Sequence, residues 1–293
     1  MPEDSSTTLP RRQLGRYLRE AREGINMNLE DVAPLLQLSV STLSRIERGL
    51  TGVRVPDVEA LCRIYGIDDS ETVAGLVGLA RQSAGKSWWQ AFDDVMSRNF
   101  DLYVGFESSA KKLTIYRPDM LSGLFQTPDY ARALDRIYLP DVSDEARDRR
   151  IQLKKKRQAL ITRKTKPALV DLVVHESVLH TTVGGSKVMR EQLNRLANMP
   201  ANVTVSVLPF SAGFPVGAST GPFTILEFGE DTRGREVSPT VVYVESYAGD
   251  LYLERPKDVN RYRQAYDAIR QSSLDVASSK RLVRRIAARE YQA

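Results

Sequence analysis

Apolar residues recur at three- and four-residue spacing from Leu9 to about Ala84, and Gly, Asn and Pro divide them into short segments. This spacing predicts five short helices between Arg11 and Ala84, and hence an all-α domain. Small and polar residues follow at 83–87, and the composition changes beyond them. We therefore expect a domain boundary near residue 85.

The longer remainder alternates strand-like and helix-like segments. Runs rich in Val, Ile, Tyr and Thr predict strands at Lys112–Arg117, Ala168–Val174, Val203–Leu208, Phe223–Phe228 and Thr240–Val244. Helical spacing predicts helices at Pro128–Tyr138, Ser143–Thr162, Ser186–Asn198 and Pro256–Ser272, and a last basic helix near Ser278–Glu290. Strands interleaved with helices predict a larger α/β (α+β) domain.

These patterns divide the chain into four predicted parts. Residues 1–8 are polar and are expected to form a disordered tail. Residues 9–85 are the helical domain, and residues 86–275 are an α/β regulatory or partner-binding domain. Residues 276–293 are a basic C-terminal helix.

The second and third predicted helices carry the start signals of a helix-turn-helix. Asn28 is a good N-cap, and Asp31 stands where its side chain bonds back to the cap. Ser39 caps the third helix after the three-residue turn 37–39, and Gly49 ends it. Two capped helices joined by so short a turn match the helix-turn-helix motif, whose second helix enters the DNA major groove.

The third helix has the composition of a DNA-reading helix. Its apolar residues Leu43 and Ile46 are three apart and face inward, so hydroxyl and arginine side chains remain outside. Hydroxyls bind phosphates or bases, and arginine bridges O6 and N7 of guanine. The expected DNA-binding residues are Ser39, Val40, Ser41, Thr42, Ser44, Arg45, Arg48, Thr51 and Arg54. Periodicity alone also allows a solvated surface helix with two arginines.

Two residues near this helix have predicted structural roles. Glu47 lies on its inner side, away from DNA, and we expect an ion pair with Arg22 of the first helix. Pro34 falls inside the second helix, where it removes a backbone hydrogen bond and is expected to kink the helix.

The first domain resembles a known family. The matching segments are Leu14–Ala21, Leu29–Leu36, Ser39–Gly49 and Pro56–Gly66, and they resemble the xenobiotic-response-element type of helix-turn-helix, similar to phage repressors. The resemblance implies a five-helix domain that binds a two-fold symmetric operator on double-stranded DNA as a homodimer.

The rest of the chain, from about Trp88 to Arg285, resembles the WhiJ-like regulators of actinobacteria. The matching segments are Leu121–Arg132, Arg157–Leu160, His175–Leu179, Glu191–Leu193, Asn202–Phe210, Gly221–Phe223 and Val241–Glu245. The resemblance implies regulation of developmental and antibiotic genes. It also implies a small acidic or neutral partner protein encoded nearby, in an antitoxin-like arrangement, and no known chemistry for the second domain.

Composition narrows the classes of function. The chain of 293 residues has one cysteine, Cys62, which excludes an internal disulfide and a multi-cysteine metal cage. Because it shows neither a membrane-spanning apolar run nor a secretory signal, we expect a cytoplasmic protein, nucleoid-associated when bound to DNA. The net charge is +5, yet residues 1–85 hold ten Lys and Arg against twelve Asp and Glu. The DNA-binding prediction therefore depends on the motif rather than on bulk charge.

The second domain has a candidate partner or ligand region but no evident active site. The candidate residues are Gln126, Tyr130, Arg150, Lys154, Arg157, His175 and Glu176. His175 and His180 are five apart, a spacing that does not place two ligands on one helical face, so neither a metal nor a cofactor is expected. The basic run 147–157 has three interpretations. A solvated helix face is favoured most, a binding site for an acidic partner protein comes second, and accessory contact with DNA phosphates comes third.

Two functions from different classes follow. The first is a dimeric, sequence-specific DNA-binding transcriptional regulator whose second domain senses a partner protein or a small ligand. The second is an antitoxin-like protein that mainly binds a small partner protein, with DNA binding serving autoregulation. An enzyme fused to a helix-turn-helix is a third hypothesis, which the scarcity of His and Cys and the lack of a nucleophile motif disfavour.

Overall fold

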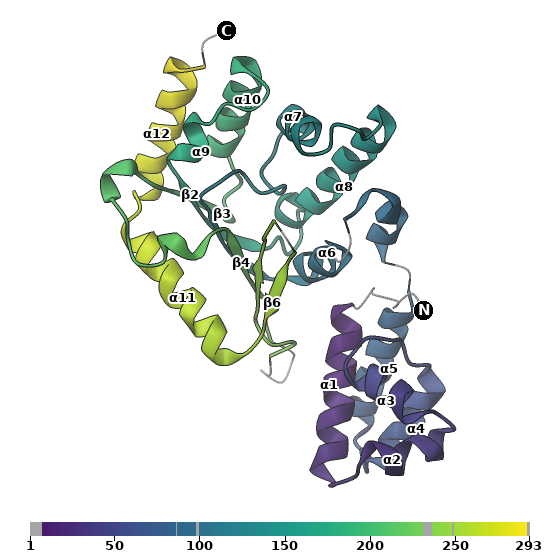
Figure 1. The fold of residues 1–293 in the computed structure, drawn as a ribbon. Coiled ribbons are helices and arrows are strands. Elements are labelled where there is room, and N and C mark those ends of the chain that lie inside the picture. Colours follow the sequence, from purple (N-terminus) through teal and green to yellow (C-terminus); the bar gives the residue numbers. More distant parts are fainter. Residues whose placement is uncertain (1–7, 86, 98–99, 231–235, 248, 292–293) are drawn as a thin grey trace. The chain divides into compact units, whose positions relative to one another are not determined.

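The computed structural model describes residues 8–85, 87–97, 100–230, 236–247 and 249–291. The chain divides into two compact units, Met1–Ser109 and Ala110–Ala293 (Figure 1). Of the predicted tail, residues 1–7 lie outside the described residues. Thr8 is the N-cap of the first helix, and its hydroxyl oxygen accepts a hydrogen bond from the Arg11 amide.

The first unit is helical. Its elements are α1 (Leu9–Gly24), α2 (Leu29–Val32), the 3₁₀ helix η1 (Ala33–Leu36), α3 (Val40–Glu47), α4 (Val55–Ile64), α5 (Ser70–Ala84), the 3₁₀ helix η2 (Trp88–Val95) and α6 (Phe100–Ser109). The predicted second helix is thus divided into an α-helical turn and a 3₁₀ turn. The change falls at Pro34, which has no amide hydrogen to donate to an α-helical ladder.

Residues 88–109, which the sequence pattern placed in the second domain, cluster with the first unit. Neither η2 nor α6 is among the predicted elements. In α6 the five consecutive residues from Tyr103 to Glu107 are all buried. A helix that is buried on all sides has apolar residues on all sides. It therefore lacks the single apolar stripe by which an amphipathic helix is recognised in a sequence.

The core of the first unit joins α1, α3, α4 and α5. Leu18 and Leu43 are fully buried in it. A Cβ atom at Gly15 of α1 would lie 2.4 Å from the carbonyl oxygen of Ile46 in α3. Glycine therefore lets the backbones of α1 and α3 touch, and this contact sets where α3 lies.

The second unit is built on a mixed six-stranded sheet of the described residues, in the order β3-β2-β1-β4-β5-β6. Its strands are β1 (Lys112–Arg117), β2 (Leu169–His175), β3 (Val203–Leu208), β4 (Phe223–Glu227), β5 (Val241–Val244) and β6 (Leu251–Leu253). Neighbours among β1, β2 and β3 run parallel, and β4, β5 and β6 continue the sheet antiparallel. The predicted α/β class is confirmed, while the short strand β6 was not predicted.

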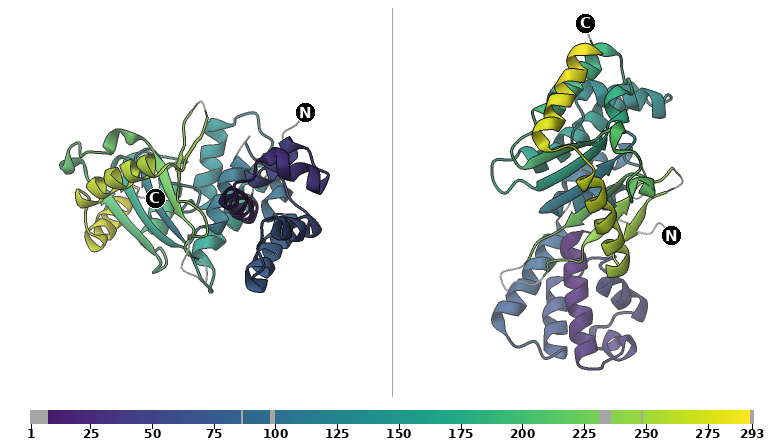
Figure 2. Two further views of the ribbon diagram at one scale, coloured as in Figure 1. Left: turned by 90° about the horizontal axis from the view of Figure 1, so that it is seen from below. Right: turned by 90° about the vertical axis from the view of Figure 1, so that its left-hand side faces the viewer.

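Helices cover both faces of this sheet (Figures 1 and 2). They are α7 (Pro128–Tyr138), α8 (Asp144–Thr162), α9 (Ser177–His180), α10 (Ser186–Ala197), α11 (Pro256–Gln271) and α12 (Val276–Arg289), with 3₁₀ turns η3 (Phe210–Ala212) and η4 (Ala218–Thr220). On one face, Leu208 of β3 shares an apolar cluster with Ile269 of α11. Val205 is three positions before Leu208 on β3, so its side chain points to the opposite face of the sheet. There it lines a small cavity with Leu196 of α10 and Val283 of α12.

Candidate nucleic-acid interface

The connection between α2 and α3 is a tight turn held by local hydrogen bonds. The Asn28 amide donates to the Asp31 carboxylate at 3.0 Å, which organises the start of α2. Gln37 adopts the left-handed conformation, with φ of 55°, and ends η1. The Thr42 amide then donates to the Ser39 hydroxyl oxygen at 3.0 Å, so Ser39 caps α3.

The inner side of α3 is anchored to α1. Leu43 and Ile46 are buried, and Glu47 is buried beside them. Nε and Nη2 of Arg22 donate to the two Glu47 carboxylate oxygens at 2.7 and 2.8 Å, while Nη1 donates to the Met27 carbonyl oxygen. The side chains of this two-pronged pair are only 10% and 3% exposed. The pair expected from the sequence is thus a buried link between the two helices.

The opposite side of α3 faces solvent. Ser39, Val40, Ser41 and Arg48 are exposed, and Thr42, Ser44 and Arg45 are partly exposed. The Ser39 and Thr42 hydroxyls hydrogen-bond each other at 2.8 Å. The outer face of α3 therefore presents short hydroxyls near its start and two arginines near its end.

The loop after α3 has its own charged contact. Thr51 is partly exposed, and the Arg54 guanidinium donates to both carboxylate oxygens of Asp57, at 2.8 and 3.0 Å. Donating these hydrogen bonds to Asp57 raises the pKa of Arg54, whose side chain is 79% exposed. A DNA phosphate would have to share this guanidinium with Asp57.

Two apolar side chains near α3 were not predicted to be exposed. Leu35 of η1 is 61% exposed and Leu50, just after α3, is 37% exposed. Leu35 belongs to an apolar run that suggests a core position, whereas Leu50 is a single apolar residue between Gly49 and Thr51. Leu35 lies in the 3₁₀ helix η1, whose side chains do not follow α-helical spacing, and Pro34 is the sequence signal for that change of helix type.

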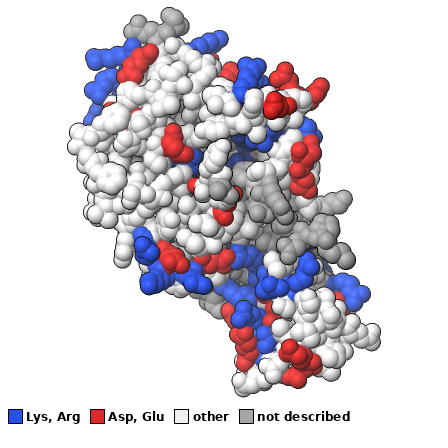
Figure 3. All heavy atoms as spheres, viewed as in Figure 1, with Lys and Arg blue, Asp and Glu red and all other residues white. Residues whose placement is uncertain are grey.

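Charge does not mark the interface by itself. Lys and Arg are interspersed with Asp and Glu over the visible face of the molecule (Figure 3). The shape and composition of α3, rather than a single-sign basic surface, distinguish the candidate site.

The basic run in α8 is largely engaged within the second unit. The buried Arg147 donates to the carbonyl oxygens of Asp135, Leu139 and Pro140 at 2.8–3.0 Å. Arg150 and Lys154 bind the two carboxylate oxygens of the buried Asp135, at 3.0 and 3.1 Å. Burial lowers the pKa of Lys154. These charges fasten α8 to α7.

Three other candidate residues of the second unit also lie inside it. Tyr130 is 1% exposed, and burial raises the pKa of its phenol to about 12. Gln126 is buried and donates to the Leu121 carbonyl oxygen at 2.7 Å. Arg157 is buried, with its guanidinium packed beside Gly123. These side chains support the 121–126 loop from within and present no outer surface to a partner.

His175 and Glu176 follow β2 and bond to neighbouring loops. His175 Nδ1 is 2.7 Å from the Ser177 hydroxyl, and burial lowers the pKa of the imidazole. The Phe210 amide donates to the Glu176 carboxylate at 2.7 Å. Hydrogen bonding within the unit thus occupies both side chains.

The part of the chain that the structure describes contains no group of three His, Cys, Asp or Glu side chains suited to a metal ion. It also contains no helix with the length and apolar character needed to cross a membrane.

Comparison with known proteins also distinguishes two parts of the chain, but the second match begins at residue 100 and so includes α6, which clusters with the first compact unit. Residues 13–74 match a helix-turn-helix domain family, and residues 100–285 match a domain of unknown function, DUF5753. The HTH-type transcriptional regulator DdrOP3 of Deinococcus deserti is 30% identical over 127 residues, which are 43% of this chain and 81% of that protein. No solved structure matches the chain significantly. Since the DUF5753 match covers more than half of the sequence, the chain belongs to the DUF5753 family, with a helix-turn-helix domain preceding that domain.

Proposed function

We propose that this chain is a sequence-specific DNA-binding transcriptional regulator that reads its operator with α3. One observation carries the proposal: α3 buries Leu43, Ile46 and Glu47 and turns a face of serines, threonine and arginines to solvent. The name of the Deinococcus deserti relative supports the same class of function.

The residues of this face have distinct proposed roles. Arg45 and Arg48 reach the guanine edges in the major groove, where a guanidinium binds O6 and N7 together. Val40, 37% exposed at the first turn, contacts a thymine methyl group. The hydroxyls of α3, with Thr51 and Arg54 of the following loop, bind phosphates and set the position of the helix.

The finer proposal is a WhiJ-like regulator that acts as a homodimer in the cytoplasm, on an operator of two symmetric half-sites. The second unit then senses a partner or a small ligand, without a cofactor and without catalysis. Arg147, Arg150 and Lys154 of α8 bond to groups within this unit. This disfavours α8 as a broad phosphate-binding surface.

Selection of bound sequences from random duplex DNA by the full chain tests this proposal. A dimer of this type should enrich an inverted repeat with half-site centres about 10 bp apart, or a multiple of that spacing. Footprinting on the enriched sequence should protect both half-sites. Recovery of unenriched DNA at moderate salt would contradict sequence-specific reading, and enrichment of a single half-site would contradict the dimer.

A second candidate function, antitoxin-like neutralisation of a small partner protein, is favoured by one observation. The segment after β3 exposes three apolar side chains, with Phe210, Phe214 and Val216 at 56%, 79% and 81% exposure. Apolar side chains gathered in one exposed segment are typical of protein-binding sites. If neutralisation is the main role, Phe214→Ser should abolish capture of the product of the neighbouring small gene while operator binding persists.

A further inference from the structure

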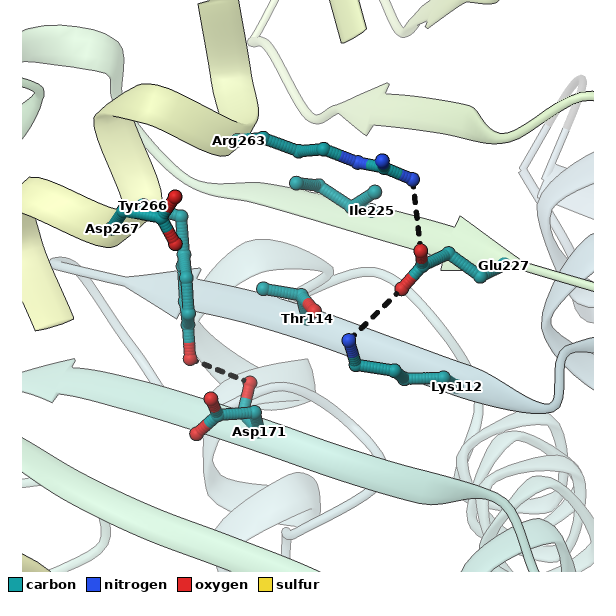
Figure 4. A pocket seen from close by; sticks show the side chains of 8 residues that line it. All are labelled: Lys112, Thr114, Asp171, Ile225, Glu227, Arg263, Tyr266 and Asp267. Carbon is teal, nitrogen blue, oxygen red and sulfur yellow. Dashed lines mark hydrogen bonds and ion pairs between the residues drawn. The ribbon is translucent and has the colours of Figure 1, made fainter. Parts of the chain in front are cut away.

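The sheet face beneath α11 changes from apolar to polar along its strands. Thr114 of β1 is aligned with Asp171 of β2 on one side and with Ile225 of β4 on the other. In the next row Lys112 of β1 is aligned with Glu227 of β4. These five side chains form the floor of a cavity of about 220 Å³, and Arg263, Tyr266 and Asp267 of α11 complete its lining (Figure 4).

Asp171 occupies an unusual position for a carboxylate. It lies within β2, an inner strand with parallel neighbours on both sides, between the buried Val170 and Leu172. Such strands are normally continuous apolar runs, because helices cover both faces of the sheet. The Asp171 side chain is nevertheless 34% exposed, so solvent reaches part of it from the cavity side of the sheet.

One oxygen of the Asp171 carboxylate has unused hydrogen-bonding capacity. Oδ1 is buried and accepts no hydrogen bond from any described residue. The Arg270 Nε lies 3.8 Å from it, within ion-pairing range but beyond a hydrogen bond. Buried acceptors in proteins are normally paired, and no described donor is bonded to this one. Because Oδ1 itself is buried, a ligand in the cavity reaches the exposed part of the Asp171 side chain.

Four other polar residues of the lining already have partners: Lys112, Glu227, Arg263 and Tyr266. Glu227 accepts a hydrogen bond from Arg263 at 2.8 Å and lies 3.3 Å from the Lys112 ammonium. The Tyr266 hydroxyl donates to the Asp171 carbonyl oxygen at 3.0 Å, and burial raises the pKa of this phenol, which keeps it protonated. Figure 4 shows Lys112, Glu227 and Arg263 together on one side and the carboxylate of Asp171 on the other.

We propose that this cavity binds a small aliphatic amine whose ammonium group is held by the Asp171 carboxylate. Three carboxylates and two cations line the cavity. Both cations pair with Glu227, so Asp267 and Asp171, which has only Arg270 at 3.8 Å, remain to attract a cationic ligand. The Thr114 hydroxyl is a further acceptor, and Ile225 and the Tyr266 ring provide apolar contact for the carbon chain. A cavity of about 220 Å³ is smaller than drug-sized pockets and suits a ligand of a few carbons.

The cations across the cavity add a second feature. Lys112 and Arg263 share the single carboxylate of Glu227, so an anionic group at the far end of the ligand finds two donors there. An amine that also carries a terminal carboxylate should therefore bind more tightly than the plain amine.

This site gives the ligand-sensing part of the proposed function a location and a ligand class. Binding is measured on the full chain without DNA. Its failure would therefore leave DNA reading by α3 untouched, and failure of DNA reading would leave the cavity untouched.

Calorimetric titration of the full chain with n-butylamine, 4-aminobutyrate and n-butanol tests the proposal. The amine should bind, the aminocarboxylate should bind more tightly, and the alcohol, which lacks the charge, should not bind. Asp171→Asn, which keeps the shape of the side chain, should weaken butylamine binding about tenfold or more, because a charge-assisted hydrogen bond is lost. Lys112→Gln should weaken only 4-aminobutyrate.

Asp258→Asn, on the first turn of α11 and outside the cavity lining, is the matched control and should bind like the parent. If Asp171→Asn fails to fold, Asp267→Lys reverses a lining charge at an exposed position and should weaken butylamine several-fold. Equal binding of butanol and butylamine, or unchanged butylamine binding by Asp171→Asn or Asp267→Lys, would overturn the proposal. So would the absence of amine binding at about 10 mM, where even a weak small ligand is detected.

Discussion

At the scale of single residues, the first unit depends on one buried charge pair. Arg22 and Glu47 are joined by two hydrogen bonds with almost no exposure, and Arg22 also bonds a backbone carbonyl. The bond with Glu47 raises the pKa of the Arg22 guanidinium. A single substitution here leaves a buried charge without its partner.

Glu47→Gln should lower the free energy of unfolding by about 3 kcal/mol, because the Arg22 charge stays buried and unpaired. Urea unfolding followed by circular dichroism measures this. The control is Asp57→Asn, which breaks the pair with the 79% exposed Arg54 and should cost less than about 1 kcal/mol. Equal losses for the two variants would show that burial of the Arg22–Glu47 pair does not matter.

Reading of bases is also a property of single side chains. Arg45→Ala should weaken binding to the selected operator by about 1–3 kcal/mol and relax preference at one base pair, because a contact to two base atoms is lost. Fluorescence anisotropy with matched and single-mismatch duplexes measures both effects. Arg81→Ala, on α5 outside the proposed interface, should leave affinity and preference unchanged. Retention of full affinity by Arg45→Ala would mean that another face of the unit contacts the bases.

At the scale of elements, the position of the reading helix depends on a glycine. The contact of α1 with α3 leaves no room for a side chain at Gly15, since a Cβ would lie 2.4 Å and 2.7 Å from the Ile46 and Glu47 carbonyl oxygens. The backbone of α3 itself therefore packs on α1, and the outer face of α3 is directed accordingly.

Gly15→Ala should lower the free energy of unfolding by about 1–3 kcal/mol, since the helices must separate to admit a methyl group. It should also weaken operator binding, because α3 shifts with respect to its neighbours. The same substitution at Gly75 in α5, where nothing lies within 4 Å, should instead raise stability by about 0.5–1 kcal/mol through helix propensity. Thermal and urea unfolding of both variants distinguish the two effects, and a stable Gly15→Ala protein would refute the close contact.

At the scale of the whole molecule, the proposed functions belong to separate units. DNA reading is assigned to α3 in the first unit, and amine binding to the β-sheet and α11 in the second. The first unit also includes α6, and the Arg12 guanidinium of α1 lies 4.7 Å from the centre of the Phe106 ring in α6. This contact joins α6, which lies beyond residue 85, to the first unit.

A fragment of residues 1–109 should therefore unfold cooperatively and be more stable than a fragment of residues 1–85. The expected difference is at least about 0.5–1 kcal/mol, the value of one cation–π contact. Urea unfolding of the two fragments measures it. Equal stabilities would restore a domain boundary near residue 85 and leave α6 with no part in the first unit.

Local chemistry explains what was predictable. The caps at Asn28 and Ser39, the apolar pair of α3 and the β-branched strands act over a few residues, so the spacing of the sequence was enough to locate them. The bounds predicted for β1, β3 and α7 agree with those of the structure. Two helices were missed. In α6 consecutive residues are buried, so no apolar stripe marks the helix. In η2 the buried Trp89, Phe92 and Val95 are three apart, the spacing of a short 3₁₀ helix, and that signal was overlooked.

The sequence by itself determined the helix-turn-helix, the outward face of α3 and the alternation of strands with helices. These properties depend on caps, periodicity and side-chain shape along short stretches of chain. Only the tertiary structure decided that Gln126, Tyr130 and Arg157 are interior, and that Asp171 meets Thr114 and Tyr266 in one cavity. Strand order and helix packing bring together residues that are far apart in the chain, and no local pattern encodes those contacts.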